Sequence, residues 1–362
     1  MLYHLLLPLT EYISGFNLFR YITFRTAGAT VTAIIICLFL GPFFINLLKK
    51  YQVRESIRRE GPASHQKKAG TPTMGGLIIL AGIIIPSLLW ARLDNFYILS
   101  LLLVTVWLGV IGFMDDYLKC IKKQPRGLVA RRKLIAQILL GLVFALFLTY
   151  MAPGGQYNGM TNIPFLKNYV LNLGILYVPF IVLVITSSSN AVNLTDGIDG
   201  LAIGLCGICF LTFTGFVYVS GRLDFSSYLQ IEYFPGSGEL AVYCGAALGA
   251  VLGFLWFNSN PAEVFMGDTG SLALGGALGA IAIMIKKELL LVIVGGVFVI
   301  EVLSVIIQVL SYKYRGGKRV FKMAPLHHHF ELKGWPEAKV VVRFWILGAL
   351  CALLTLATLK IR

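Results

Sequence analysis

The segment at residues 256–271 separates two apolar runs of the chain and carries a dense group of polar side chains. Those runs, residues 240–257 and 271–285, could each cross a bilayer as a helix. An ordinary connection needs only turn residues, whereas this one ends in Gly-Asp-Thr-Gly-Ser at residues 267–271. Backbone amides at a helix start, beside a carboxylate and hydroxyls, can hold phosphate and a metal ion. The alternative is that Asp268 and its neighbouring hydroxyls only cap the helix.

A pair of adjacent acids, Asp115 and Asp116, ends the third apolar run. The helix dipole disfavours negative charge at this end, so capping does not explain them. Two acids beside Lys119 suggest a site for a hard cation or a phosphate, and Mg²⁺ prefers such oxygen ligands. Consecutive residues on a helix point about 100° apart. We therefore expect Asp115 to face a substrate phosphate and Asp116 to lie nearer the metal ion or Lys119.

Two further acids, Asp196 and Asp199, precede the sixth apolar run. A carboxylate at a helix start can be a cap that complements the helix dipole, and the residues alone leave this alternative open. A carboxylate at a membrane boundary is otherwise disfavoured unless it is solvated, paired or bound to a metal ion. Because the polar clusters all fall on one side of the membrane, both acids are candidates for the same site.

Three consecutive histidines, His327, His328 and His329, lie in the last long polar loop. Zinc binding is disfavoured because adjacent side chains diverge and no Cys or Asp frames the three. Phosphate binding or proton transfer by one or two of the imidazoles is the favoured interpretation. Glu301, deep in the ninth apolar run, is expected to face the bundle interior, with holding helices together as its simplest role.

The composition defines the class of protein. Of the 362 residues, 57 % are hydrophobic and only 13 % are charged, and the mean hydropathy is +0.79. A soluble domain of this length does not need so much apolar surface. Residues 1–19 lack the basic start of a signal peptide, so we expect an interfacial helix there. Cys206 and Cys209 form a C-x-x-C without a nearby His or second pair, and we treat the cysteines as small apolar residues.

About ten apolar runs are predicted to cross the membrane as helices, which makes the chain an all-α polytopic membrane protein. A single integral membrane domain is expected over residues 1–362. Gly295 and Gly296 are candidates for a kink in the ninth span. The predicted spans lie at about residues 24–47, 73–91, 96–114, 133–152, 173–189, 199–220, 239–257, 270–285, 288–311 and 341–359.

The distribution of Lys and Arg over the loops predicts the orientation of the chain. Loops 48–72, 115–133 and 312–343 contain seven, seven and eight of them, together 22 of the 31 in the chain. By the positive-inside rule these loops are cytoplasmic. The polar loops at 186–199 and 258–270 fall on the same side.

Both termini are then predicted to be periplasmic, together with a hairpin or loop at residues 153–172. All candidate site residues lie at the other end of the helices. We therefore expect the site in a cleft at the cytoplasmic face, beside a loop at residues 312–340 that carries the histidines and is called the His-loop below.

Several motifs of the chain resemble those of the polyprenyl-phosphate N-acetylhexosamine-1-phosphate transferases. The resemblance extends from about residue 15 to the C-terminus. The Asp-Asp and Asn-x-x-Asp-Gly-x-Asp-Gly elements are common to that superfamily, and the triple-His loop points to its phospho-N-acetylmuramoyl-pentapeptide branch. The matching motifs are residues 70–76 (GTPTMGG), 115–117 (DDY), 190–200 (NAVNLTDGIDG), 265–268 (FMGD) and 325–335 (PLHHHFELKGW).

The resemblance implies transfer of phospho-N-acetylmuramoyl-pentapeptide from its UDP carrier to undecaprenyl phosphate, giving lipid I and UMP in peptidoglycan synthesis. It implies Mg²⁺ as cofactor, with Mn²⁺ able to substitute, and the bacterial cytoplasmic (inner) membrane as the location. The partners implied are the two substrates and membrane lipids, with no nucleic acid and with a homodimer left open. One phosphoanhydride replaces another, so catalysis must come from positioning and charge neutralisation.

The resemblance also implies roles for individual residues. Asp115, Asp116 and Asp268 are the catalytic candidates, with Asp268 as a ligand of Mg²⁺ and Asp116 as a second candidate ligand. The uracil would be held by Gly197, Asp199 and Phe265, with Phe265 stacking on the base. The phosphate and sugar region would be lined by Lys68, Thr73, Lys119, Lys133, Asn190, Asn193, Asp196, Asn258, His327, His328 and His329.

A transporter is the main alternative from a different class of function, because ten helices and an intramembrane Glu301 suit one. Transporters place polar groups near the midplane on discontinuous helices, whereas here they gather at helix ends. The nearer alternative is a related transferase that uses UDP-N-acetylglucosamine. Release of UMP from each UDP-sugar in the presence of undecaprenyl phosphate separates the three.

Overall fold

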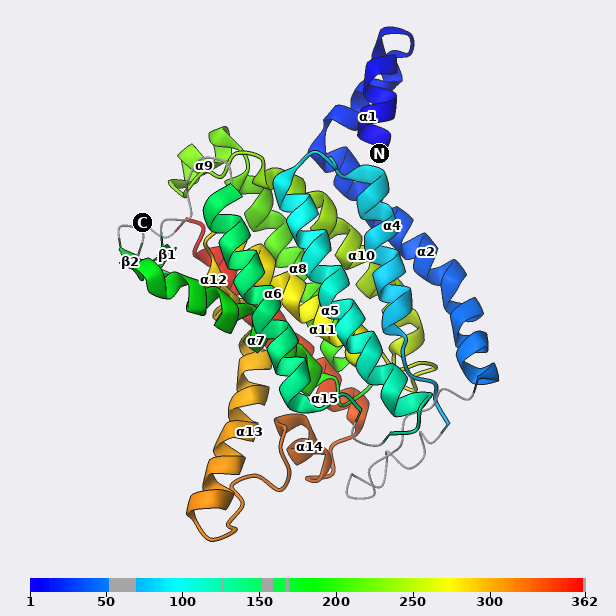
Figure 1. The fold of residues 1–362 in the computed structure, drawn as a ribbon, viewed down its shortest axis with the longest axis vertical. Coiled ribbons are helices and arrows are strands. Elements are labelled where there is room, and N and C mark those ends of the chain that lie inside the picture. Colours follow the sequence, from blue (N-terminus) through cyan, green and yellow to red (C-terminus); the bar gives the residue numbers. More distant parts are fainter. Residues whose placement is uncertain (52–69, 125–126, 152–158, 167–168, 361–362) are drawn as a thin grey trace.

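The computed structural model describes residues 1–51, 70–124, 127–151, 159–166 and 169–360, which form a bundle of helices (Figure 1). The sheet found in these residues has two strands. The elements are α1 (Leu2–Leu6), η1 (Leu7–Glu11), η2 (Ser14–Arg20), α2 (Ile22–Lys50), α4 (Gly76–Trp90), α5 (Phe96–Cys120), α6 (Ala130–Met151), β1 (Met160–Asn162), β2 (Val170–Asn172), η4 (Gly174–Leu176), α7 (Tyr177–Thr195), α8 (Leu201–Ser220), α9 (Leu223–Leu229), η5 (Ser237–Glu239), α10 (Leu240–Asn258), α11 (Gly267–Met284), α12 (Glu288–Val294), α13 (Gly296–Tyr314), α14 (Leu326–Glu331) and α15 (Glu337–Ala357).

Nine helical segments of the described chain are long and apolar enough to cross a membrane, which confirms the all-α polytopic class. The predicted span at 73–91 is shorter than expected, because α4 has 15 residues and begins only at Gly76. The residues before it pair with another segment instead of extending the helix. Gly75 N–H donates to Phe265 O at 2.8 Å, and Phe265 N–H donates to Pro72 O at 2.9 Å. This pairing places the segment beside the start of α11.

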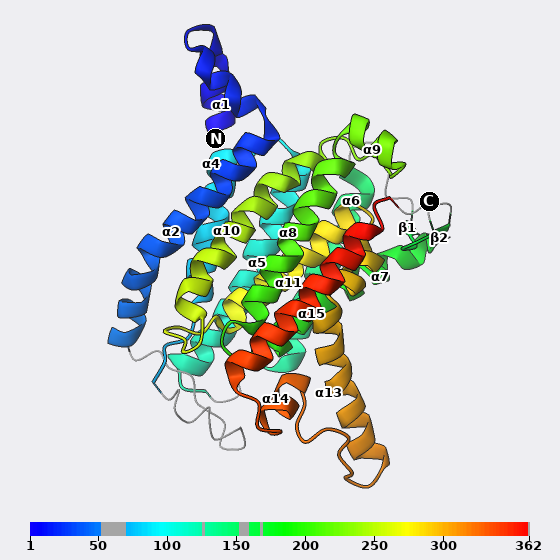
Figure 2. The same ribbon diagram turned by 180° about the vertical axis from the view of Figure 1, so that it is seen from behind.

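The ninth predicted span is divided into α12 and α13, with Gly295 between them. Gly295 N–H still donates to Leu291 O at 2.8 Å. Because Gly295 has no Cβ, the chain can change direction between α12 and α13 at the kink that the sequence indicated. Helix α13 then leaves the bundle and projects beyond its end (Figures 1 and 2).

Helix α11 is the centre of the bundle. Every residue from Thr269 to Met284 is buried, and the helix packs against α4, α5, α7 and α8. A Cβ on Gly76 would collide with the backbone of Gly270, and one on Gly112 would collide with the carbonyl oxygen of Asp268. Only glycine allows α4 and α5 to approach the start of α11 this closely. The fold thereby brings three helices together where the polar residues gather.

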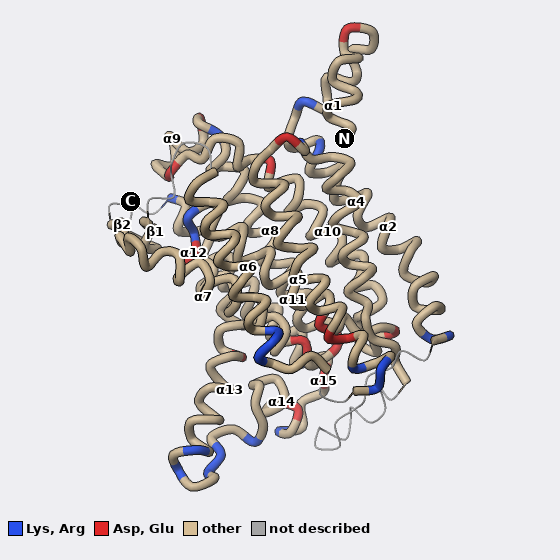
Figure 3. Tube along the Cα trace, viewed as in Figure 1, with Lys and Arg blue, Asp and Glu red and all other residues tan. Residues whose placement is uncertain are grey.

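Both chain ends lie at the end of the bundle opposite the start of α11 (Figures 1 and 2). Figure 3 shows the charged residues of the described chain gathered mainly at the two ends of the bundle. Which end faces the cytoplasm stays a prediction. The N-terminal segment is helical but is divided into α1, η1 and η2, because Pro8 at the start of η1 lacks the N–H that would continue one helix.

The predicted outer hairpin contains the antiparallel strands β1 and β2, with Thr161 opposite Leu171. It is fastened to the chain between α11 and α12. The Thr161 hydroxyl donates to Glu288 Oε2 at 2.7 Å, and Lys286 Nζ donates to Met160 O at 2.7 Å. These contacts form a polar cluster at the end of the bundle away from the candidate site.

Burial lowers the pKa of Lys286 to about 8, although nearby Glu288 and Glu232 oppose the shift. The unfolded chain keeps this proton up to a pKa of about 10.4. Stability should rise between these two values, because the unfolded state binds more protons than the folded state. We expect the Tm of the native chain, relative to that of Lys286→Met, to be higher at pH 9.5 than at pH 7.5. Melting both proteins in one detergent checks this, and an identical pH dependence would contradict it.

Candidate active site

The start of α11 is capped by a residue of another helix. Asp116, in the last turn of α5, accepts hydrogen bonds from the N–H groups of Asp268 at 3.0 Å and Thr269 at 2.9 Å, and from the Thr269 hydroxyl at 2.6 Å. A carboxylate here pairs donors that a helix leaves unsatisfied and complements the helix dipole. The alternative that Asp268 is itself the cap is wrong, because no side chain of its own segment caps α11.

The Asp268 carboxylate is the meeting point of three other helices. Lys119 of α5 and Lys133 of α6 donate to its Oδ2 at 3.1 and 2.7 Å, and Asn193 of α7 donates to its Oδ1 at 2.7 Å. Asn193 also donates to Ser271 Oγ at 2.9 Å, which fixes its amide against α11. Four predicted residues from four helices therefore converge on one spot.

Asp115 joins the same cluster through the lysines. Lys119 Nζ lies 2.7 Å and Lys133 Nζ 3.7 Å from its Oδ2, while Leu128 N–H donates to Oδ1 at 2.5 Å. Of the two positions expected for Asp116, near the metal ion or near Lys119, the second is wrong, because Lys119 pairs with Asp115. The i, i+4 spacing puts Asp115 and Lys119 on one helix face, whereas Asp116 lies about 100° round and faces α11.

Access to the cluster differs among its members. Asp115 is 2 % exposed and Asp116 is 4 % exposed. The side chain of Lys119 is 37 % exposed and that of Asp268 is 14 % exposed. A ligand would thus meet the Lys119 ammonium and one edge of Asp268 first, and a phosphate there would compete with the carboxylates for both lysines.

The donor set fits a divalent cation that is held largely by substrate and water. Within the described ranges, no three His, Cys, Asp or Glu side chains form a metal cage. Mg²⁺ is commonly held by one or two carboxylates together with waters and substrate phosphates, and Asp268 offers such an oxygen. Cys206 and Cys209 are buried free thiols, in keeping with their predicted role as small apolar residues.

Asp199 fastens the loop that leads from α10 to α11. Its Oδ2 accepts hydrogen bonds from Asn260 Nδ2 at 3.2 Å and from Ala262 N–H at 3.1 Å. Its own N–H donates to Glu337 Oε1 at 2.8 Å. The N-cap residue of α8 is Gly200, which has no side chain to cap the helix, and the two hydrogen bonds given above show that the Asp199 carboxylate holds the loop. Asp196, three residues earlier in the sequence, is the C-cap residue of α7 and is half-buried.

Asn258 and Asn190 both support the frame around the cluster. Asn258 Oδ1 accepts from Gly200 N–H at 3.1 Å, and its Nδ2 donates to Val264 O at 2.9 Å. Asn190 donates to Gln137 Oε1 at 2.8 Å, which turns its amide toward α6. The substrate contacts predicted for both amides stay predictions.

The segment before α4 and the turn before α11 pack closely. Thr73 is buried, and a Cβ on Gly267 would lie 3.2 Å from its Oγ1 and 2.7 Å from Asp116 Oδ2. Gly267 also has a φ of +74°, which favours glycine. Phe265 is half-buried beside this turn. Lys68, another predicted substrate contact, lies outside the described residues.

The first two histidines of the His-loop contact different acids. His327 is fully buried, and its Nδ1 lies 3.2 Å from Glu301 Oε2. His328 Nδ1 lies 2.8 Å from Glu331 Oε2. The rings of His327 and His328 contact each other, with centroids 4.1 Å apart, so the expectation that adjacent side chains diverge is wrong for this pair. Within the described residues no three His, Cys, Asp or Glu side chains are placed to hold a metal ion, and Nδ1 of each of these two rings faces a different acid.

His329 lies on the outer side of the His-loop. Its Nδ1 accepts a hydrogen bond from Lys322 N–H at 3.1 Å. Burial, Lys333 and Lys322 lower the pKa of His329 from its ordinary value. This environment disfavours the charged form of the imidazole.

Some residues of the site were not identified from the sequence. Gln137 follows Lys133 by one helical turn in an otherwise apolar helix, and that spacing was the available signal. Leu128 donates its backbone N–H to Asp115, and such a contact cannot be predicted from the type of the side chain. Glu337 binds the N–H of Asp199 from a distant part of the chain.

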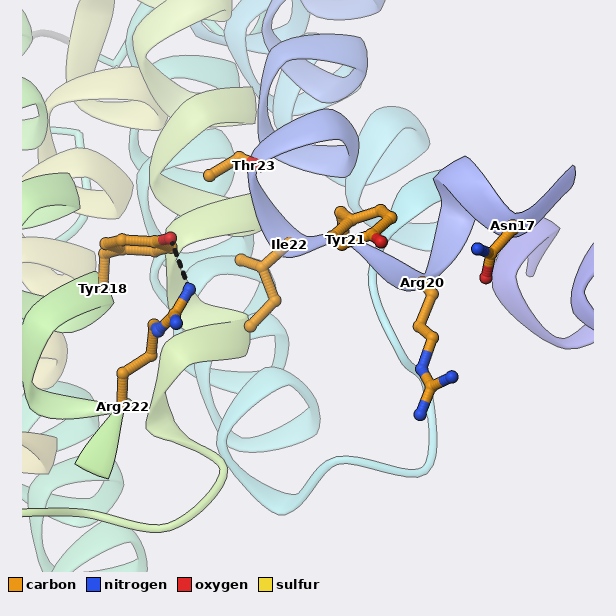
Figure 4. Close-up of a pocket in the computed structure, with 7 residues that line it drawn as sticks. All are labelled: Asn17, Arg20, Tyr21, Ile22, Thr23, Tyr218 and Arg222. Carbon is orange, nitrogen blue, oxygen red and sulfur yellow. Dashed lines mark hydrogen bonds between the residues drawn. The ribbon is translucent and has the colours of Figure 1, made fainter. Parts of the chain in front are cut away.

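A pocket of about 430 Å³ lies at the opposite end of the bundle, between the start of α2 and the end of α8. Figure 4 shows Arg222 directed toward the Tyr218 hydroxyl, 3.0 Å away, while Arg20 points away from both. Arg222 is also paired with Asp224 at 2.6 Å. Because the two guanidinium groups do not converge, the pocket is not a second anion site.

The fold and the site define a polytopic membrane transferase, and comparison with known families agrees. The family model for glycosyl transferase family 4 matches residues 98–286, which include the whole acid and lysine cluster. A phospho-N-acetylmuramoyl-pentapeptide-transferase signature matches residues 68–80, which include the residues that bond to Phe265 and Met266 just before α11.

Comparison with full-length relatives identifies the branch of the transferases to which the chain belongs. Proteins named phospho-N-acetylmuramoyl-pentapeptide-transferase from Pelobacter propionicus and Thermodesulfovibrio yellowstonii are 56 % and 54 % identical to the chain, over 100 % of both sequences. One from Endomicrobium trichonymphae is 49 % identical over the same share. The chain belongs to the phospho-N-acetylmuramoyl-pentapeptide-transferase family and is a multi-pass protein of the bacterial inner membrane.

Proposed function

We propose that the chain transfers phospho-N-acetylmuramoyl-pentapeptide from UDP to undecaprenyl phosphate, which releases UMP and forms lipid I. The observation that carries the proposal is the convergence of Asp115, Asp268, Lys119 and Lys133 at one end of the bundle. Membership of the family supports it. A site at helix ends also suits an acceptor whose phosphate lies at the membrane surface while its hydrocarbon chain stays in the bilayer.

The proposed reaction exchanges one phosphoanhydride for another. The bond between the sugar-bearing phosphorus and the UMP oxygen breaks, and that phosphorus becomes bonded to an oxygen of the lipid phosphate. Negative charge then develops on the departing UMP phosphate. Lys119 and Lys133 are held in place by carboxylates and would neutralise that charge, and preorganised charges in a partly buried site stabilise it more than water does.

Asp115 is the proposed contact for the acceptor phosphate. The second proton of a phosphate monoester has a pKa of about 6, so part of the acceptor carries that proton at neutral pH. Asp115 would take this proton or orient the phosphate through Lys119, whose ammonium lies 2.7 Å from it. The small exposure of Asp115 favours contact by way of Lys119.

We further propose Mg²⁺, or Mn²⁺ in its place, as the cofactor. When bound, the cation would neutralise charge on the donor diphosphate. Asp268 would hold it, because this acid combines a carboxylate oxygen with an accessible edge. Asp116, the second predicted ligand, already accepts three hydrogen bonds from the start of α11, and its contact with the metal stays a prediction.

The nucleotide is proposed to lie beside Gly197, Asp199 and Phe265. Support comes from the loop between α10 and α11, which Asp199 fastens at Ala262 and which leads directly to Phe265. A half-buried aromatic ring at this position can stack on a base.

Release of UMP by the purified chain tests the proposed function. The assay contains undecaprenyl phosphate, Mg²⁺ and either UDP-N-acetylmuramoyl-pentapeptide or UDP-N-acetylglucosamine. We expect release from the first donor alone. Release from the second alone would assign the chain to the related transferase, and release from neither would contradict a transferase. Whether the chain forms a homodimer, which the resemblance left open, is a separate matter that cross-linking in membranes would test.

A further inference from the structure

One face of α13 holds the His-loop. Four polar residues recur at spacings of three and four in this helix and therefore share a face. Gln308 Oε1 accepts from the N–H groups of Val320 and Phe321 at 3.0 Å, and Gln308 Nε2 donates to Phe321 O at 2.9 Å. The Ser311 hydroxyl donates to Lys318 O at 2.9 Å. The polar face consists of Glu301, Ser304, Gln308 and Ser311. Glu301, Gln308 and Ser311 contact the His-loop, whereas the hydroxyl of Ser304 bonds within α13.

Glu301 contacts the His-loop where α14 begins. The backbone N–H of His327 donates to Glu301 Oε1 at 3.2 Å, and Nδ1 of the same residue lies 3.2 Å from Oε2. Both side chains are 0 % exposed. The carboxylate thus accepts one hydrogen bond from the first turn of α14 through Oε1, while Oε2 and the imidazole Nδ1 lie close together without a hydrogen bond in the described part of the chain. The expectation that Glu301 faces the interior is confirmed, but its partner is a loop and not another spanning helix.

The other edge of the His327 ring faces the turn between α7 and α8. A Cβ on Gly197 would collide with Nε2. This nitrogen has no hydrogen-bond partner in the part of the chain that the structure describes. The ring therefore lies between the Glu301 carboxylate and the Gly197 backbone, and it also contacts the ring of His328, with centroids 4.1 Å apart.

We infer that Glu301 is a positioning residue, which fixes His327 and thereby holds the His-loop against the turn at Gly197. The inference rests on the proposed function for the identity of the ligand, a uridine diphosphate sugar bound at that turn. A buried carboxylate is strongly unfavourable unless it is paired. Outside α13, Glu301 accepts a hydrogen bond from the His327 N–H and lies within ion-pair distance of the imidazole of the same residue, so both of these contacts act on the start of α14.

A double-mutant cycle on Glu301→Gln and His327→Asn tests the inference. Glu301→Gln should lower kcat/KM for the donor by on the order of 10²-fold, mainly through a higher KM, because the His-loop is misplaced. The kcat/KM of the double variant should be no lower than that of the less active single variant, because both changes remove the same contact. Ser304→Ala is the matched control. Its hydroxyl donates only to Glu301 O within α13, at 2.7 Å, and its activity should match the native chain.

Amide hydrogen exchange gives a second readout that does not need turnover. Exchange at residues 326–331 should be faster in Glu301→Gln than in the native chain or Ser304→Ala. Unchanged exchange, or losses in kcat/KM that multiply in the double variant, would overturn the inference. A native chain that folds and binds the uridine diphosphate sugar but does not transfer the phospho-sugar would instead count against the proposed function. The exchange data would still decide the role of Glu301.

Discussion

Replacing Asp268 with Asn is expected to lower kcat by about 10³-fold or more, while the protein still folds and purifies. The change keeps the size of the side chain but removes the charge that receives Lys119 at 3.1 Å and Lys133 at 2.7 Å. It also removes the proposed ligand of the cation. The fold should persist because both lysines keep Asp115 as a partner and Asp116 still caps α11.

The control for this prediction is Asp224→Asn. That acid is paired with Arg222 at the opposite end of the bundle, and its replacement should leave UMP release unchanged. Steady-state rates and Tm are measured for both variants. An Asp268→Asn protein with near-native kcat would show that the cluster is not the site of transfer.

Replacing Asp116 with Asn should also cause a large loss, on the order of 10²-fold in kcat, but by a different route. Asp116 receives two backbone N–H groups and one hydroxyl from the first turn of α11. An amide offers one acceptor oxygen, so at least one buried donor loses its partner, at about 1–3 kcal/mol of stability. The start of α11 would shift, and Asp268 would move with it. We expect a lower Tm together with the lower kcat.

The Mg²⁺ dependence decides between this role and the predicted metal contact of Asp116. If Asp116 acts by placing α11, the Mg²⁺ concentration for half-maximal activity should be unchanged. A raised Mg²⁺ requirement with an unchanged Tm would make Asp116 a ligand and contradict the positioning role. Thr269→Val serves as the control, because it removes only the hydroxyl donor and should have a smaller effect on both quantities.

Residue type and position at helix ends singled out Asp115, Lys119 and Asp268, which the structure brings together, whereas Lys133 and Asn193 were implied only by the family resemblance. Acids at helix ends without a capping reason, as at Asp115, indicated that the helix ends meet in a polar cluster. The i, i+4 relation of Asp115 and Lys119 was present in the sequence, yet Asp116 was considered as the partner. Apolar run lengths predicted the spans because helices in lipid must be long and apolar.

The contacts that could not be predicted all depend on segments distant in the sequence. The delayed start of α4 follows from pairing between Pro72 and Phe265, which no local propensity reveals. Asp116 caps a helix that begins more than 150 residues later, and no local signal in the sequence indicates a cap so distant. A charge within a span suits a role in joining helices, and only the folded His-loop shows that His327 is the neighbour of Glu301.

Release of UMP as a function of Mg²⁺ concentration tests most directly the claim that the Asp268 cluster carries a cation-dependent transfer. The purified chain is assayed with donor and undecaprenyl phosphate, then with excess EDTA, then after addition of Mg²⁺ or Mn²⁺. We predict that turnover stops in EDTA and returns with either cation, and that Asp268→Asn does not respond. Full turnover in excess EDTA, or a native Mg²⁺ response in Asp268→Asn, would contradict the account.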